Sequence, residues 1–122
     1  MRTLTDHRVN ECNEAIDINV IDDPGAGGAH HEYVVVTNPG KPNSDTMRIT
    51  FQNGPVKEVG TNGLTQEALL AIVADRLRSF QSGQYACREN ALALTKIEEA
   101  MHWLQHRTRA RVARGVEGTH VK

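Results

Sequence analysis

The chain has 122 residues, of which 39% are hydrophobic and 24% charged. These values are typical of one folded domain and exclude a disordered chain. Its first residues lack the apolar core of a signal peptide, and no apolar run approaches the roughly 18 residues that span a bilayer. The two cysteines, Cys12 and Cys87, are too few for a disulfide framework. We therefore expect a cytoplasmic protein that is neither secreted nor inserted in a membrane.

Charge is distributed unevenly along the chain. Residues 1–64 contain five Lys/Arg and nine Asp/Glu, whereas residues 102–122 contain five Lys/Arg and one Asp/Glu. The basic end therefore suggests either an anionic partner or association with the acidic end of another subunit. Only 4% of the residues are aromatic, and such a thin core also favours association of subunits.

The first half of the chain has the pattern of β-strands. Alternating or β-branched residues predict strands at 15–21, 32–37 and 47–52, with a short return strand at Val56–Val59. Glycine- and proline-rich segments separate them. The expected structure of residues 1–63 is an antiparallel meander of three or four strands.

The second half has helical spacing. Thr65 is expected to cap a first helix that ends at Ser82-Gly83, and a second helix should run from about Cys87 to about Val112. The short connection makes the helices antiparallel neighbours. The prediction is therefore an α+β fold in one domain, 1–122, with a β-meander followed by a two-helix hairpin and basic tail over 64–122.

The strongest local signal is the basic segment HRTRARVARG. Arg107, Arg111 and Arg114 are spaced to share one helix face, whereas Arg109 points elsewhere. Guanidinium groups bind phosphate oxygens bidentately and stack on flat bases. A solvated helix end is the alternative, because cations are also favourable there. The absence of acidic residues between Glu99 and Glu117 favours an anion site.

A second group of candidates surrounds the expected turn between the helices. Arg88 and Asn90 open the second helix, where free N–H groups suit phosphate and an amide can bind an adenine edge; both could equally be ordinary first-turn residues. Phe80 and Tyr85 flank the turn, and each could stack on a base or belong to the core.

Catalytic and metal-binding patterns are not found. His30 and His31 are adjacent on an expected strand and would point to opposite faces, which makes a shared metal ion awkward. The GAGG segment lacks the spacing of a dinucleotide fingerprint. No nucleophile–base pair has a supporting motif, so we expect no cofactor, no metal and no enzymatic activity.

The segments ACRENALALT, WLQHRTR and RGVEGTH are distinctive. Through them, residues 51–120 resemble a family of small phage proteins, the Thoeris anti-defence signal sponges, which share a helical hairpin with the anti-CBASS sponges. The first sixty residues resemble the family only loosely, mainly in GGAHHEY. The resemblance implies a protein that binds glyco-cyclic ADP-ribose, the messenger of a bacterial immune TIR enzyme, without cleaving it. Some members also sequester cyclic di- or trinucleotides at separate sites and form hexamers built from dimers.

The resemblance also implies roles for particular residues. It places Phe80 against the adenine, Asn90 near its edge, and Arg107 on the diphosphate together with either Arg111 or Arg114. The candidate ligand-binding residues are then Phe80, Arg88, Asn90, Arg107, Arg111 and Arg114. At 1.5 Å per residue, Arg107 lies about 25 Å along the helix from Asn90. One small ligand cannot reach both within a subunit, so we expect a composite site in a homodimer.

Two other functions fit the same residues less well. A nucleic-acid-binding hairpin would need a broad basic surface, which the acidic first half does not favour. A purely structural phage protein would leave the arginine cluster without a role.

Overall fold

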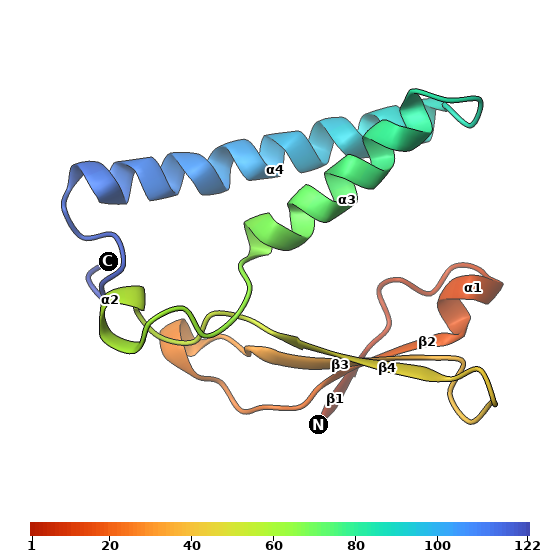
Figure 1. Ribbon diagram of the computed structural model, residues 1–122, viewed down its shortest axis with the longest axis horizontal. Coiled ribbons are helices and arrows are strands. Elements are labelled where there is room, and N and C mark those ends of the chain that lie inside the picture. Colours follow the sequence, from red (N-terminus) through yellow and green to blue (C-terminus); the bar gives the residue numbers. More distant parts are fainter. The chain divides into compact units, whose positions relative to one another are not determined.

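The computed structural model describes residues 1–122, which form two compact units. The first unit comprises Met1–Gly54 and Val59–Leu64, and the second comprises Pro55–Glu58 and Thr65–Lys122. In chain order the elements are β1 (Arg2–Leu4), α1 (Glu11–Glu14), β2 (Ile16–Val20), a 3-10 turn (Ala26–Gly28), β3 (Glu32–Thr37), β4 (Asp45–Thr50), α2 (Val56–Val59), α3 (Gln66–Gln81) and α4 (Arg88–Ala113) (Figure 1). Neither long helix is apolar enough to cross a bilayer.

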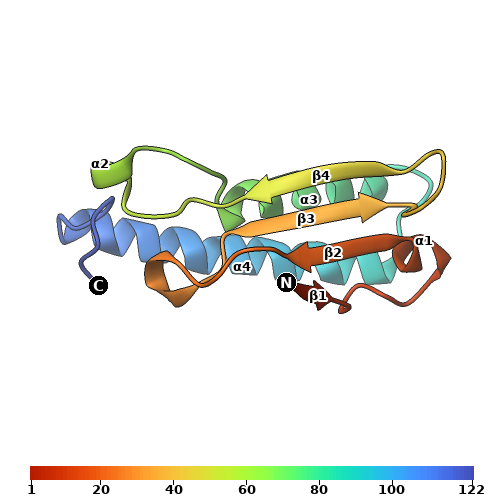
Figure 2. The same cartoon turned by 90° about the horizontal axis from the view of Figure 1, so that it is seen from below.

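The first unit is built on a four-stranded antiparallel sheet with the strand order β1-β2-β3-β4, as seen in Figure 2. Ile18 pairs with Val35, which in turn pairs with Met47. Side chains on one face of a strand recur at every second residue, so these three side chains share a face. The predicted antiparallel meander is confirmed, with four strands.

This shared face forms the apolar side of the sheet. Tyr33 and Phe51 pack edge to face there, with ring centroids 5.7 Å apart. Val20 at the end of β2 is the most deeply buried large side chain of the unit, 2% exposed. An apolar hollow of about 280 Å³ lies against Ile18, Tyr33, Val35, Ile49 and Phe51. The aliphatic and aromatic residues of β2, β3 and β4, together with Phe51 just after β4, therefore supply this unit's core.

Some of the predicted strands were wrong in position or type. β4 begins at Asp45 and ends at Thr50, two residues before the predicted range. Val56–Val59 is the short helix α2, not a return strand. The main-chain N–H of Lys57 donates to the carbonyl of Gly118 at 2.9 Å, so a contact distant in sequence overrides the β-propensity of the two valines.

The histidines of the glycine-rich connection are structural. The Asp22 carboxylate accepts the main-chain N–H groups of His31 at 2.8 Å and Glu32 at 3.2 Å. The His30 ring donates to the carbonyl of Asp22, and the His31 ring, 7% exposed, bonds to the carbonyl of Ala26. Desolvation acts to raise the pKa of Asp22, but the two N–H donors and the nearby His30 ring together hold that pKa below its ordinary value of 3.8.

The second unit is a helical hairpin, and the predicted helix pair is confirmed. The hydroxyl of Thr65 accepts the N–H of Ala68 and caps α3, which ends at Gln81 with Ser82 as its C-cap. Gly115, with φ of 73°, follows the C-terminal cap of α4 in the left-handed conformation that glycine accepts. Ala74 is fully buried, so its small side chain allows the two helices to approach closely.

The apolar side chains of α3 and α4 are covered to different extents. Helical spacing places Ile72, Val73 and Phe80 on one side of α3, yet these side chains are 65%, 43% and 37% exposed. The apolar stripe of α4 is partly buried at each of its positions, Leu94, Ile97, Met101 and Leu104. One neighbouring helix cannot cover apolar residues on both flanks of α3, so α3 keeps an uncovered apolar flank.

Candidate functional site

The turn end of the hairpin holds the first group of predicted site residues. Cys87 is the N-cap of α4, and its Sγ accepts the N–H of Asn90 at 3.5 Å. The Cys87 N–H donates to Oε1 of Gln81 at the end of α3 and closes the turn. The Asn90 side-chain amide makes no hydrogen bond within the chain and is half-buried. Arg88 is exposed, so both side chains are available to a ligand at this helix start.

Phe80 lies on the last turn of α3, on its uncovered flank. The guanidinium carbon of Arg76, one helical turn earlier, is 5.2 Å from the centre of the Phe80 ring. An arginine in this position polarises the ring by a cation–π interaction. No carboxylate pairs with Arg76, whereas the neighbouring Arg78 bridges to Glu98 at 3.2 Å. Sequence reasoning missed Arg76, although its spacing four residues before Phe80 was the available signal.

The arginine end of α4 holds the second group. Arg107 and Arg109 are exposed, and neither makes an ion pair or a hydrogen bond within the chain. Arg114, the C-cap, donates to the main-chain oxygen of Lys122 at 2.5 Å. This end therefore presents uncompensated positive charge, which is the chemistry that a phosphate requires.

Arg111 differs from the other arginines of the cluster. It is only 8% exposed, and its Nε donates to the Glu117 carboxylate at 3.1 Å. Its terminal nitrogens donate to the carbonyls of Val116, Thr119 and Val121. We expected no acidic residue to neutralise the cluster, but Glu117 folds back past Gly115 to do so.

The two groups of predicted residues lie at opposite ends of α4 (Figure 1). Phe80, Arg88 and Asn90 lie at the turn between the helices, while Arg107 lies about 25 Å along α4 from Asn90 at the ordinary helical rise. Within one chain they are not brought together. The composite site stays a prediction.

An aromatic side chain beside the arginines was also missed from the sequence. Trp103 is 60% exposed and lies one helical turn before Arg107, on the same side of α4. The rings of His102 and His106 pack against it, with centroids 5.3 and 5.7 Å away. A flat exposed ring one turn from a free arginine suits a nucleotide, and this i, i+4 pairing was visible in the sequence.

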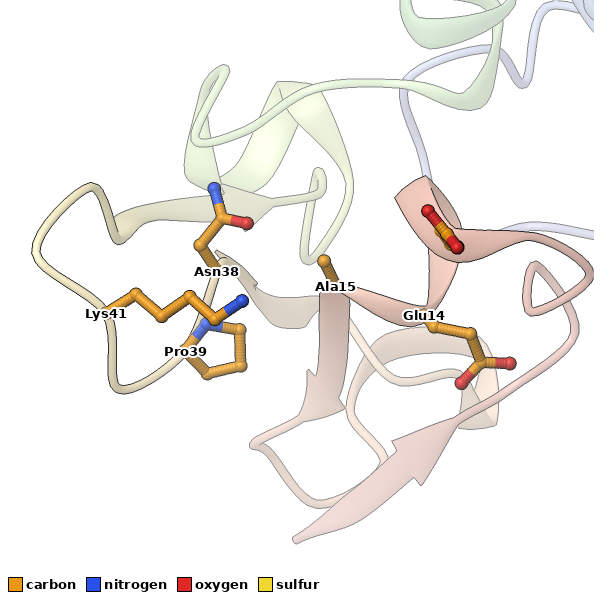
Figure 3. Close-up of a pocket in the computed structure, with 6 residues that line it drawn as sticks. Glu14, Ala15, Asn38, Pro39 and Lys41 are labelled. Atoms are coloured by element: carbon orange, nitrogen blue, oxygen red, sulfur yellow. The ribbon is translucent and has the colours of Figure 1, made fainter.

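A second hollow of the first unit lies far from this chemistry in sequence. Figure 3 shows Glu14, Ala15, Asn38, Pro39 and Lys41 around it, and Glu11 also lines its volume of about 400 Å³. None of the predicted site residues contributes to it. No three His, Cys, Asp or Glu side chains are close enough to hold a metal ion.

The sequence pattern of the family described as "Acb2/Tad1, hairpin domain" matches residues 43–109, more than half of the chain. A curated relative, Thoeris anti-defense 1 of Bacillus phage SBSphiJ7, is 48% identical over 98 residues. That match covers 80% of this chain and 66% of the relative, just under two thirds of the relative's length. Residues 43–109 contain all of α3 and most of α4, with Phe80, Arg88, Asn90 and Arg107, whereas Arg111 and Arg114 lie beyond them. The chain belongs to the Acb2/Tad1 hairpin-domain family.

Proposed function

We propose that this chain is a phage anti-defence protein that binds glyco-cyclic ADP-ribose in the host cytoplasm, holds it intact and so withdraws it from the immune receptor. The main support for this proposal is the cationic end of α4, where Arg107 is exposed and has no partner. The chain is also a relative of Thoeris anti-defense 1. Sequestration needs tight binding and no bond cleavage, and the exposed arginines, the Phe80 ring and the free amide of Asn90 are binding groups.

Each end of the hairpin suits a different part of this messenger. The arginines suit the diphosphate, because guanidinium donates two parallel hydrogen bonds to phosphate oxygens. Phe80, whose ring Arg76 polarises, suits the adenine face, and the free amide of Asn90 suits the adenine edge. Both ends are needed for one ligand.

We propose that the site is composite and that an antiparallel partner hairpin supplies the arginines, which makes the protein an obligate dimer or a higher assembly of dimers. Light scattering should then give a multiple of 13.5 kDa. The uncovered flank of α3, with Ile72 and Val73 exposed, is apolar surface that such a partner would bury. A monomer that binds tightly would contradict this arrangement.

Co-expression of two defective variants tests the composite site directly. Asn90→Asp damages the turn end and Arg107→Ala damages the arginine end. In a mixed dimer one composite site carries both changes and the other carries neither, so random assembly restores about a quarter of the sites. Separately purified variants, mixed without subunit exchange, are the control. If co-expression restores no tight binding, each site lies within one chain.

Recovery of the ligand separates sequestration from catalysis. We expect prolonged incubation with glyco-cyclic ADP-ribose, followed by heat denaturation, to release the messenger unchanged. Before denaturation the ligand should raise the melting temperature, because a hundredfold excess over the dissociation constant stabilises a fold by about 2.7 kcal/mol. Linear ADP-ribose should stabilise it much less, since its open ends do not match a site shaped for a ring. An altered product would make the protein an enzyme.

A further inference from the structure

The tail after α4 is organised around one buried cation. A guanidinium has five N–H donors, and four separate hydrogen bonds run from that of Arg111 to the tail. Glu117 supplies the only charged acceptor, while Val116, Thr119 and Val121 supply main-chain oxygens. Only one N–H of the Arg111 guanidinium is left without an acceptor, and a single N–H cannot form a bidentate bond to phosphate.

The same tail segment, residues 116–121, is also tied to α2 and is called the strap below. The Gly118 carbonyl accepts the main-chain N–H of Lys57 at 2.9 Å. Nδ1 of His120 lies 2.9 Å from the Glu58 carboxylate. The strap thus connects residues about sixty positions apart, and Arg111 is the side chain to which most of it is bonded.

We propose that Arg111 is a positioning residue: by holding the strap against the end of α4, it sets the arrangement in which Arg114 presents its guanidinium group to the ligand. Arg114 is bonded to Lys122, the residue just beyond the strap. A loose strap therefore leaves Arg114 with more conformations to lose on binding. This inference rests on the proposed function and assigns Arg111 a role within it.

The alternative is that Arg111 leaves the strap and contacts the diphosphate itself. The two roles predict opposite effects for Glu117→Gln, which removes the charge that competes for Arg111 but keeps the side-chain shape. If Arg111 contacts the ligand, the substitution frees it and the affinity rises or stays the same. If Arg111 positions the strap, the affinity falls, by roughly 3- to 10-fold for one weakened charge-assisted hydrogen bond.

The experiment measures two quantities for wild type, Glu117→Gln, Glu117→Asp, Arg111→Lys and the matched control Arg109→Lys. The first is the affinity for glyco-cyclic ADP-ribose, measured by calorimetry well below the melting temperature, where a change in stability alone leaves the affinity unmoved. The second is hydrogen exchange of the Lys57 amide in the free protein, because its acceptor belongs to the strap. Arg111→Lys keeps the charge but loses the planar fork.

We expect Glu117→Gln and Arg111→Lys to weaken binding and speed Lys57 exchange together, with Glu117→Asp recovering part of both losses and Arg109→Lys changing neither. If hydrogen exchange of the Lys57 amide is unchanged in Arg111→Lys, the strap does not depend on Arg111. Faster exchange with unchanged or tighter binding would overturn the positioning role while leaving the proposed function intact. Failure of the wild type to bind would instead refute the proposed function, and the positioning role with it.

Discussion

The two ends of α4 are built in different ways. At the turn end, local contacts are sufficient: the Cys87 cap and the Gln81 side chain fix the first turn from within a few residues. At the arginine end, the Arg111 side chain binds the strap that follows the helix, and the strap also reaches α2 through Gly118. One end is therefore closed by its own sequence neighbours alone, whereas the other adds a contact across half the chain.

The difference shows why neighbouring arginines of one cluster need not share a function. Arg107 is exposed and has no partner, whereas Arg111, one turn later, is buried with four acceptors. Their helical spacing is the same that would place both on a phosphate. Burial and the partners supplied by the strap separate a side chain that is available from one that is already engaged.

The largest effect is expected at the arginine end. Arg107→Ala should weaken binding of glyco-cyclic ADP-ribose roughly 10- to 150-fold, since a hydrogen bond to a charged group contributes about 1.5–3 kcal/mol. The melting temperature of the free protein should barely change, because Arg107 has no partner to lose. Calorimetry measures the affinity, and Arg109→Ala is the control on another side of α4. Equal losses in both variants would mean general charge attraction instead of a defined site.

A smaller effect is expected at the turn end. Asn90→Asp should weaken binding roughly 10-fold, because the carboxylate loses one amide hydrogen bond to the base and repels the diphosphate. Circular dichroism should be unchanged, since an acidic residue in the first turn of a helix is favourable. Asn90→Ser, which keeps a neutral hydrogen-bonding group, is the matched control. If binding survives in Asn90→Asp, this residue belongs to the helix start alone.

The smallest effect is expected from the cation behind the aromatic ring. Arg76→Ala should weaken binding roughly 2- to 5-fold, because an exposed cation–π interaction contributes about 0.5–1 kcal/mol. Arg78→Ala is the control, because it removes a nearby arginine that pairs with Glu98 instead of Phe80. Titration of both variants with glyco-cyclic ADP-ribose then isolates the effect of the cation over the Phe80 ring. A larger loss of affinity for Arg78→Ala than for Arg76→Ala would show that the ion pair between α3 and α4 matters more for binding than the cation over the Phe80 ring.

The fold could be predicted largely where local signals decide it. Thr65, Ser82 and Cys87 mark the helix ends in the sequence, and β2 and β3 lie within or on the predicted ranges. β1 and α1 were not predicted, because three and four residues are too short to show a period. Val56–Val59 was predicted as a strand and is a helix, because its bond to Gly118 is invisible in local sequence.

The candidate site could be predicted only in part, for a similar reason. The shared face of Arg107, Arg111 and Arg114 follows from helical spacing and can be read from one segment, whereas the sequence left Phe80 open between a ligand contact and the core. The engagement of Arg111 cannot, because Glu117 lies beyond the turn at Gly115 and reaches back only after the strap folds. Spacing identifies which side chains share a face, whereas partners from elsewhere in the chain decide which of them are free.

The caps of the two long helices differ in strength, and this gives the hairpin an uneven stiffness. Thr65 holds the start of α3 with a hydroxyl oxygen 3.1 Å from the Ala68 N–H, whereas Cys87 holds the start of α4 with a sulfur atom at 3.5 Å. Sulfur is a weak acceptor compared with oxygen, so the first turn of α4 is restrained more softly. A base bound at Asn90, as proposed, would therefore meet a helix start with the weaker of the two caps.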